Sequence, residues 1–148
     1  MGYIRLSENR LPEAKAYFET VLKHQPDHVD SWNNMANIHL ASGDTLAAVS
    51  AFERALKTDP GFAQAHFNLG VLHAQRGLFD KAQMRLKNAI ESDSTFIQAH
   101  YTLGAIYEQQ DSLAAAIQSY KTFLNGWSGD EELSRRVRQK LAALTAAP

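Results

Sequence analysis

Apolar residues recur along this chain at helical spacing, in blocks separated by short turn-forming stretches. Over residues 29–40, apolar and small side chains fall at steps of three and four, which places them along one side of a helix. Residues 41–44 bring in serine, glycine and aspartate, which favour turns. A second apolar block follows over residues 45–58, and a Pro-Gly pair ends it because proline cannot continue a helix. The pattern predicts a helix–turn–helix unit over residues 29–62.

The same unit repeats along the chain with a period of 34 residues, which is the spacing from Ala14 to Ala48. Alanines mark this period, and a bulky apolar side chain follows each of them four residues later, in the pairs Ala14 and Phe18, Ala48 and Phe52, Ala82 and Leu86, and Ala116 and Tyr120. A fixed period of this length is typical of stacked repeat proteins, in which each unit packs on its neighbours. The small residue allows two antiparallel helices to approach closely. The period predicts full units over residues 29–62, 63–96 and 97–130.

The two ends of the chain differ from these full units. Counting back by the period, residues 1–28 form a truncated first unit that begins partway through its first helix. Such an end exposes apolar surface that a repeat array normally covers. We therefore expect either that the chain is a piece of a longer protein or that another chain completes the first unit.

Residues 131–148 carry an apolar stripe at steps of four, four and three, formed by Leu133, Val137, Leu141 and Leu144. This spacing predicts an amphipathic helix that closes the array. The opposite side of that helix is basic, with Arg135, Arg136, Arg138 and Lys140. The cluster is open to two interpretations, a docking patch for an acidic partner or a solvated outer face, and the pattern favours the second.

Composition excludes several classes of protein. The formal net charge of −1 gives no field that would attract nucleic acid or an anionic membrane. No apolar run approaches the length that crosses a bilayer, so membrane insertion is not expected. The first ten residues lack the apolar core of a signal peptide, and the cytoplasm is the default expectation. The absence of cysteine excludes disulfides, thiolate catalysis and cysteine zinc sites.

No motif indicates catalysis or a cofactor. The chain has no glycine-rich phosphate loop, no nucleophile elbow and no paired zinc-binding histidines of the H-E-x-x-H type. His66 and His73 lie seven residues apart on one predicted helix face, which would suit a zinc site. Their positions in the repeat also suit rings that pack between helices, and we favour that interpretation. We therefore expect no enzyme activity, no metal and no cofactor.

The fixed positions of each unit resemble the tetratricopeptide repeat (TPR) family. The family's pattern of Trp, Leu-Gly, Tyr, Ala, Phe, Ala and Pro corresponds in this chain to Trp32, Met35-Ala36, His39, Ala48, Phe52, Ala55 and Pro60. The next two units match with substitutions, including serine in place of proline, and the resemblance covers nearly the whole chain. It implies an all-α fold: a right-handed superhelical solenoid of antiparallel helix–turn–helix repeats with a C-terminal capping helix, in a single domain over residues 1–148.

In TPR proteins the first helices of successive repeats line a concave groove that generally holds peptides. By matching positions, the resemblance implies a groove lined by Asn33, Asn34, Asn37, Gln64, Phe67, Asn68, Val71, Gln98, Tyr101, Thr102 and Glu108. TPR domains that grip the acidic C-termini of chaperones use a clamp that includes Lys and Arg. None of these positions is Lys or Arg, which disfavours that class of ligand.

Asn34, Asn68 and Thr102 occupy one repeated position. They resemble the asparagine ladder in the TPR superhelix of O-GlcNAc transferase, because an amide offers a donor and an acceptor to an extended peptide backbone. The other interpretation is that these amides face water or steady neighbouring helices. Phe67 and Tyr101 would supply apolar or stacking contacts beside them.

The sequence thus predicts a protein–protein interaction module that binds a peptide segment of a partner in its concave groove. One alternative is a scaffold that assembles with itself through the repeat ends or the convex face. Another is a non-catalytic recruitment or regulatory domain of a larger enzyme. The pattern does not identify the partner.

Overall fold

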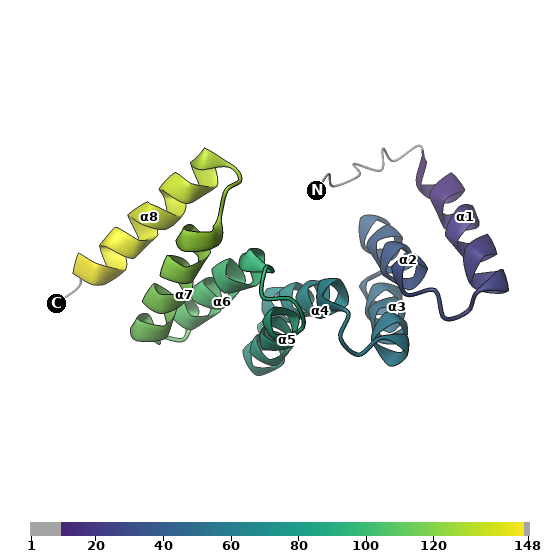
Figure 1. Cartoon of the computed structure of the whole chain (residues 1–148), viewed down its shortest axis with the longest axis horizontal. Coiled ribbons are helices and arrows are strands. Elements are labelled where there is room, and N and C mark those ends of the chain that lie inside the picture. Colours follow the sequence, from purple (N-terminus) through teal and green to yellow (C-terminus); the bar gives the residue numbers. More distant parts are fainter. Residues whose placement is uncertain (1–9, 147–148) are drawn as a thin grey trace. The chain divides into compact units, whose positions relative to one another are not determined.

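The computed structural model describes residues 10–146, and over this range the chain folds into eight helices with no strand. The helices are α1 (Leu11–His24), α2 (Val29–Ala41), α3 (Thr45–Thr58), α4 (Ala63–Gln75), α5 (Phe79–Ser92), α6 (Ile97–Gln109), α7 (Leu113–Gly126) and α8 (Glu131–Ala146), shown in Figure 1. The start of the truncated first unit, residues 1–9, lies outside the described residues.

The helix boundaries reproduce the period of the sequence. α2, α4, α6 and α8 begin at residues 29, 63, 97 and 131, so that each begins one period after the one before. α1, α3, α5 and α7 begin at residues 11, 45, 79 and 113, at the same regular spacing. We term the first set the first helices and the second set the second helices. α8 therefore begins where the first helix of a further repeat would begin.

The chain divides into two compact units, Met1–Ala65 and His66–Pro148. Each is described by itself below, and the single domain over residues 1–148 stays a prediction. In unit 1, α2 packs against both α1 and α3. The core of this packing comes from buried residues of both helices: Met35, Ala36 and Ile38 of α2, and Ala48, Ala51, Phe52 and Ala55 of α3.

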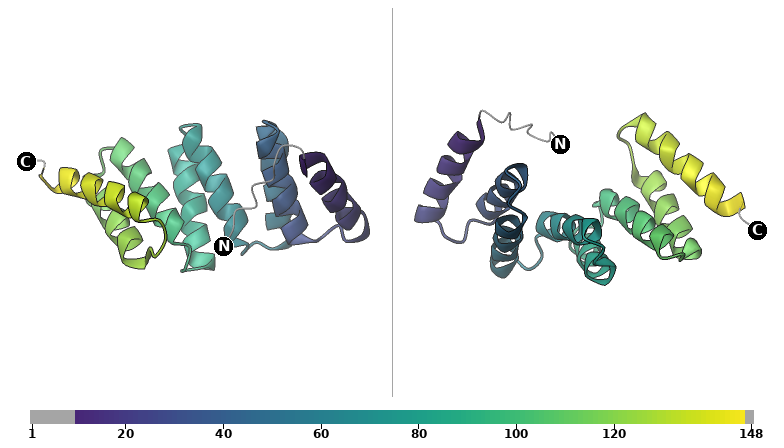
Figure 2. Two further views of the ribbon diagram at one scale, coloured as in Figure 1. Left: turned by 90° about the horizontal axis from the view of Figure 1, so that it is seen from above. Right: turned by 180° about the vertical axis from the view of Figure 1, so that it is seen from behind.

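In unit 2, the first helices form one layer and the second helices another. Two apolar clusters join the layers. In one, buried side chains of α5 and α6 meet Phe67 and Ala74 of α4. In the other, buried side chains of α7 and α8 meet Tyr101 and Tyr107 of α6. Each second helix is therefore covered by two first helices, α5 by α4 and α6, and α7 by α6 and α8. Figure 2 gives two further views of these helices, with α8 (yellow) beside α7.

Each turn from a first helix to a second helix requires one residue with positive φ. Gly43 (φ 79°), Gly77 (φ 72°) and Asp111 (φ 55°) occupy this position, one period apart. Glycine adopts this left-handed conformation without steric cost, and aspartate is among the few other residues that tolerate it. The position ends the first helix and returns the chain antiparallel to it, which sets up the helix pairs.

Close helix packing explains a second repeated position. A Cβ atom on Gly104 would lie 2.6 Å from Cε1 of Tyr120, and one on Gly70 would lie 2.7 Å from Cγ of Leu86. In α2 the same position is Ala36, which is fully buried. The small residues of the sequence pattern are thus the points where first and second helices approach most closely.

Candidate functional site

Each first helix of the full repeats keeps one row of residues that its second helix does not bury. We term this row the exposed stripe because none of its residues is buried; all are exposed or partly exposed. Its residues are Asp30, Asn34 and Asn37 in α2, Gln64, Asn68 and Val71 in α4, and Gln98, Thr102 and Ala105 in α6. The residues of a stripe are four and three positions apart, so they share one helix face. In α6, the residues on the other side, including Leu103, Gly104 and Ile106, are buried against the second helices.

In unit 1, the groove positions of the sequence analysis separate into two kinds. Asn34 and Asn37 belong to the exposed stripe of α2, whereas Asn33 is only 8% exposed.

Trp32, at the family's tryptophan position, donates from Nε1 to the carbonyl of Pro26 at 2.7 Å. The guanidinium of Arg54 lies 5.3 Å from the centroid of the same ring. Trp32 thus fastens the α1–α2 loop to α2 and α3.

In unit 2, the two aromatic groove positions contribute mainly to packing. Phe67 lies against Phe96 with ring centroids 5.1 Å apart. Tyr101 lies against Tyr120 at 6.2 Å and against Phe123 at 5.4 Å. Phe67 and Tyr101 both remain partly exposed. Their rings are therefore fixed by neighbouring helices while one edge stays at the surface.

Asn68, Val71, Gln98 and Thr102 also lie on the exposed stripes of α4 and α6. Thr102 donates from Oγ1 to the carbonyl of Gln98 at 3.3 Å, within its own helix. The threonine oxygen retains acceptor capacity. These stripes carry amides, a hydroxyl and small apolar groups, and no formal charge.

Glu108 has a different environment from the rest of the groove positions. Its Oε2 accepts from the hydroxyl of Tyr120 at 2.7 Å. Lys140 of α8 donates from Nζ to both of its carboxylate oxygens, at 2.9 and 3.1 Å. The Lys140 ammonium also lies 6.0 Å from the centroid of the Tyr120 ring. Glu108 thus joins α6 to α7 and α8.

These contacts shift the titration of both acids. The hydrogen bonds from Lys140 and then Tyr120 hold the pKa of Glu108 below its ordinary value, because they stabilise the carboxylate. Burial, followed by the hydrogen bond to Glu108, raises the pKa of the Tyr120 hydroxyl. Glu108 is therefore ionised and Tyr120 is neutral around pH 7, which is the state that both hydrogen bonds require.

The sequence analysis missed that α8 continues the layer of first helices. Glu132, Arg136 and Gln139 stand one period after the stripe of α6, and all three are exposed. The repeat period alone could have indicated this, because residue 131, where α8 begins, is one period after residue 97, where α6 begins. After the uncharged stripes of α4 and α6, the corresponding face of α8 therefore carries one acid, Glu132, and one cation, Arg136.

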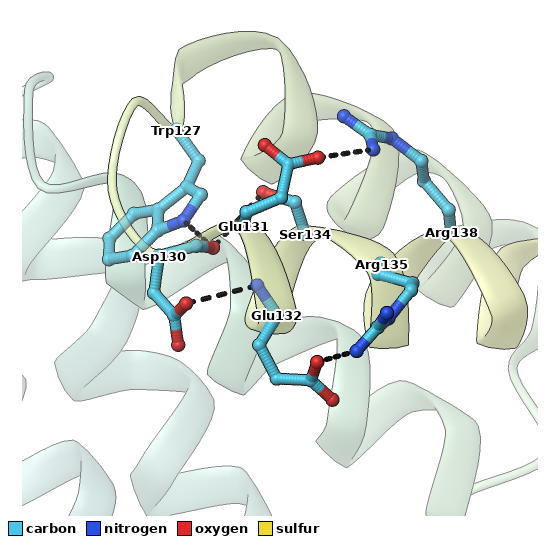
Figure 3. Close-up of polar contacts among 7 residues, drawn as sticks. All are labelled: Trp127, Asp130, Glu131, Glu132, Ser134, Arg135 and Arg138. Atoms are coloured by element: carbon cyan, nitrogen blue, oxygen red, sulfur yellow. Dashed lines mark hydrogen bonds and ion pairs between the residues drawn. The ribbon is translucent and has the colours of Figure 1, made fainter.

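The basic cluster of α8 is largely paired with acids (Figure 3). Arg135 pairs with Glu132, and Arg138 lies 3.5 Å from Glu131, so both pairs are within the helix. Lys140 pairs with Glu108. Pairs of this kind are expected on a solvated helix face. They support that interpretation of the cluster over an acidic-partner patch.

His66 and His100 lie partly or wholly between helices. His66 is 5% exposed, and burial lowers the pKa of His100, which favours the neutral ring. Across residues 10–146, no group of three or more His, Asp or Glu side chains is placed to hold a metal ion. Over the same residues, every helix is too short or too polar to span a membrane.

The chain resembles several solved structures. It matches the crystal structure of MamA with a TM-score of 0.77 and 19% identity, over 97% of this chain and 83% of MamA. It matches pilF of Pseudomonas aeruginosa with a TM-score of 0.79 and 20% identity, over 94% of this chain and 62% of pilF. At such identities the likeness shows the fold alone.

A third match is the N-terminal domain of stress-induced protein-1 from C. elegans, with a TM-score of 0.65 and 19% identity, over 76% of this chain and 94% of that domain. No curated protein matches the chain by sequence. The tetratricopeptide repeat family model matches residues 1–44, 33–83 and 75–131. These matches confirm the resemblance in the sequence and the all-α solenoid of helical repeats: the chain belongs to the tetratricopeptide repeat family.

Proposed function

We propose that this protein holds a peptide segment of a partner protein against the exposed stripes of its first helices. TPR proteins are generally non-catalytic scaffolds, and the fold supports a protein–protein interaction module in general. The observation that carries the finer proposal is that every first helix of the full repeats has one face that its second helix leaves uncovered, at the same three positions.

The chemistry of the stripes favours an extended peptide backbone as the ligand. Asn34, Asn68 and Thr102 hold the central position of the three stripes. Amide and hydroxyl groups pair with the N–H and C=O groups of any sequence. The stripes of α4 and α6 carry no charge that would demand a charged ligand. Side-chain selectivity would come from Val71 and from the exposed edges of Phe67 and Tyr101.

The stripes of α4 and α6 carry only amide, hydroxyl and apolar side chains, and the stripe of α2 adds a single carboxylate, Asp30. A nucleophile is activated by a neighbouring base, and these stripes place none beside a hydroxyl. We therefore propose that binding is the whole activity of the described residues. Association with the partner would be reversible and set by backbone pairing together with apolar contacts.

The test begins with selection of peptides from a random library on the full chain. A selected peptide is then titrated against the double variant Asn34→Ala/Asn68→Ala. Loss of two ligand hydrogen bonds should weaken binding by roughly tenfold. The control is Ser50→Ala/Gln118→Ala, which changes two exposed polar residues of the second helices α3 and α7.

The control should bind like the wild type, and circular dichroism should show that both double variants stay helical. Affinity that is unchanged in Asn34→Ala/Asn68→Ala would contradict the proposal. So would a library that yields no binding peptide at all.

One observation favours the alternative of self-association. α1 buries none of its residues, and Tyr17 is 65% exposed, whereas Ala51 and Ser119 at the same repeat position are 4% and 8% exposed. An apolar helix face of this kind is a potential contact for another helix.

A further inference from the structure

α8 is bound less extensively than the other first helices. Among its residues only Ser134 and Val137 are buried. By comparison, α6 buries Ala99, Leu103, Gly104 and Ile106, and α2 buries five residues. Leu133, Leu141 and Leu144 add contacts to α7 but remain partly exposed. Val137 is fully buried against α7, but α8 as a whole buries fewer residues than α6 or α2, so the apolar contribution that holds it in place is smaller than theirs.

The two ends of α8 are fastened in different ways. At its start, Trp127 stacks on Phe123 with centroids 5.1 Å apart and donates from Nε1 to the carbonyl of Asp130 at 3.2 Å. The carboxylate of Asp130 accepts from the backbone N–H of Glu132 at 3.0 Å, which caps the helix (Figure 3). Trp127 thus connects the beginning of α8 to α7, and the Asp130 cap stabilises the first turn of α8.

Farther along α8, one polar contact crosses to another helix. Lys140 donates to both carboxylate oxygens of Glu108, which also accepts from the fully buried Tyr120. The other two ion pairs of α8 lie within the helix itself. Among these three ion pairs, only that of Lys140 therefore changes its geometry when the second half of α8 moves away from α6 and α7.

We propose that α8 is a detachable lid, hinged at Trp127–Asp130 and held closed by the contact between Lys140 and Glu108. Its opening uncovers the apolar cluster around Phe123 and Tyr120, and it leaves the α4–α7 core folded. A single amphipathic helix is unstable without its packing partner, so the opened part of α8 loses helix. Opening also removes Lys140 from the carboxylate of Glu108, one of the groove positions, which keeps its hydrogen bond from Tyr120.

This inference goes beyond the proposed function and does not depend on it, because it needs no ligand. It predicts that α8 exchanges its amide hydrogens in local openings, separately from α6 and α7. Weakening the Lys140 contact should raise the population of the open form and leave the core unaffected.

The test is hydrogen exchange of the full chain, followed by mass spectrometry at the level of peptides. Lys140→Met removes the charge and keeps the aliphatic stem. It should speed exchange in residues 137–146 by about two- to tenfold, with no change in α5. Arg138→Met is the matched control, since it removes an ion pair within α8 and should have a smaller effect. Glu108→Gln should act like Lys140→Met, and Lys140→Arg should restore slow exchange.

High salt provides a second comparison. Raising the ionic strength should speed exchange of α8 in the wild type and should have little further effect in Lys140→Met. The proposal is overturned if α8 and α7 exchange at one common rate in the wild type, since they then open as one cooperative unit. It is also overturned if Arg138→Met and Lys140→Met have equal effects.

Discussion

At the scale of single residues, one repeated position shows how packing selects the side chain. Ala36, Gly70 and Gly104 share this position, and all three are buried. Gly70 faces Leu86 and Gly104 faces Tyr120, the bulky residue of the second helix. The facing residue in the third repeat is Tyr120, which is fully buried and held by Glu108. A ring fixed in this way cannot move aside for a larger neighbour, so glycine is required at residue 104.

We expect Gly104→Val to destabilise the protein by roughly 2–3 kcal/mol, because its side chain would overlap the ring of Tyr120. Urea unfolding followed by circular dichroism measures this change. The control is Ala105→Val, which introduces the same side chain at the neighbouring, partly exposed position. Helix propensity alone would favour valine over glycine at residue 104 and disfavour it relative to alanine at residue 105. A loss in Gly104→Val that does not exceed the loss in Ala105→Val would therefore contradict the packing explanation.

Glu108 is a residue whose contacts with other helices the sequence pattern does not predict. The repeat pattern places it among the groove residues, and that assignment stays a prediction. Its bonds to Tyr120 and to Lys140, which is 32 residues away, follow from how α6, α7 and α8 cross. A periodic pattern contains no information on which long side chains meet between helices.

At the scale of helices, the starts of the second helices differ in how they are capped. Asp44 accepts a hydrogen bond at 3.0 Å from the backbone N–H of Ala47, at the start of α3. Ser112 occupies the same position before α7, and its side chain makes no capping hydrogen bond. Both residue types are favoured at helix N-caps, so the sequence alone does not distinguish them.

We therefore expect the same truncation to have different costs at the two caps. Asp44→Ala should lower the free energy of unfolding by about 1 kcal/mol, and Ser112→Ala should lower it by less than about half of that. Thermal unfolding of the two variants beside the wild type gives the comparison. Equal losses would indicate that Ser112 caps α7 in solution after all.

At the scale of the whole molecule, the open question is whether the chain acts alone or with copies of itself. The uncovered face of α1 belongs to unit 1, and the lid α8 belongs to unit 2. Counting back by the repeat period predicts exposed apolar surface on the first unit. The contact that holds α8, by contrast, depends on how α6, α7 and α8 cross.

Sedimentation velocity over a range of concentrations tests the alternative of self-association. If α1 mediates it, the wild type should form larger species as its concentration rises, and Tyr17→Lys should remain a monomer. Leu46→Lys is the control, since Leu46 is 76% exposed on α3 and should not affect an α1 contact. A wild type that stays monomeric throughout removes this alternative and leaves the groove proposal as it stands.

The sequence by itself determined the helices, their pairing and the family, because these depend on local periodicity. The repeat period fixes which positions are small, which are bulky and where the chain turns. It also places Asn34, Asn68 and Thr102 at one position, and the structure leaves all three partly exposed. Only the tertiary structure decided that Phe67 and Tyr101 pack mainly against neighbouring helices and that Lys140 reaches Glu108. Such contacts depend on the angles and distances between helices, which no local pattern encodes.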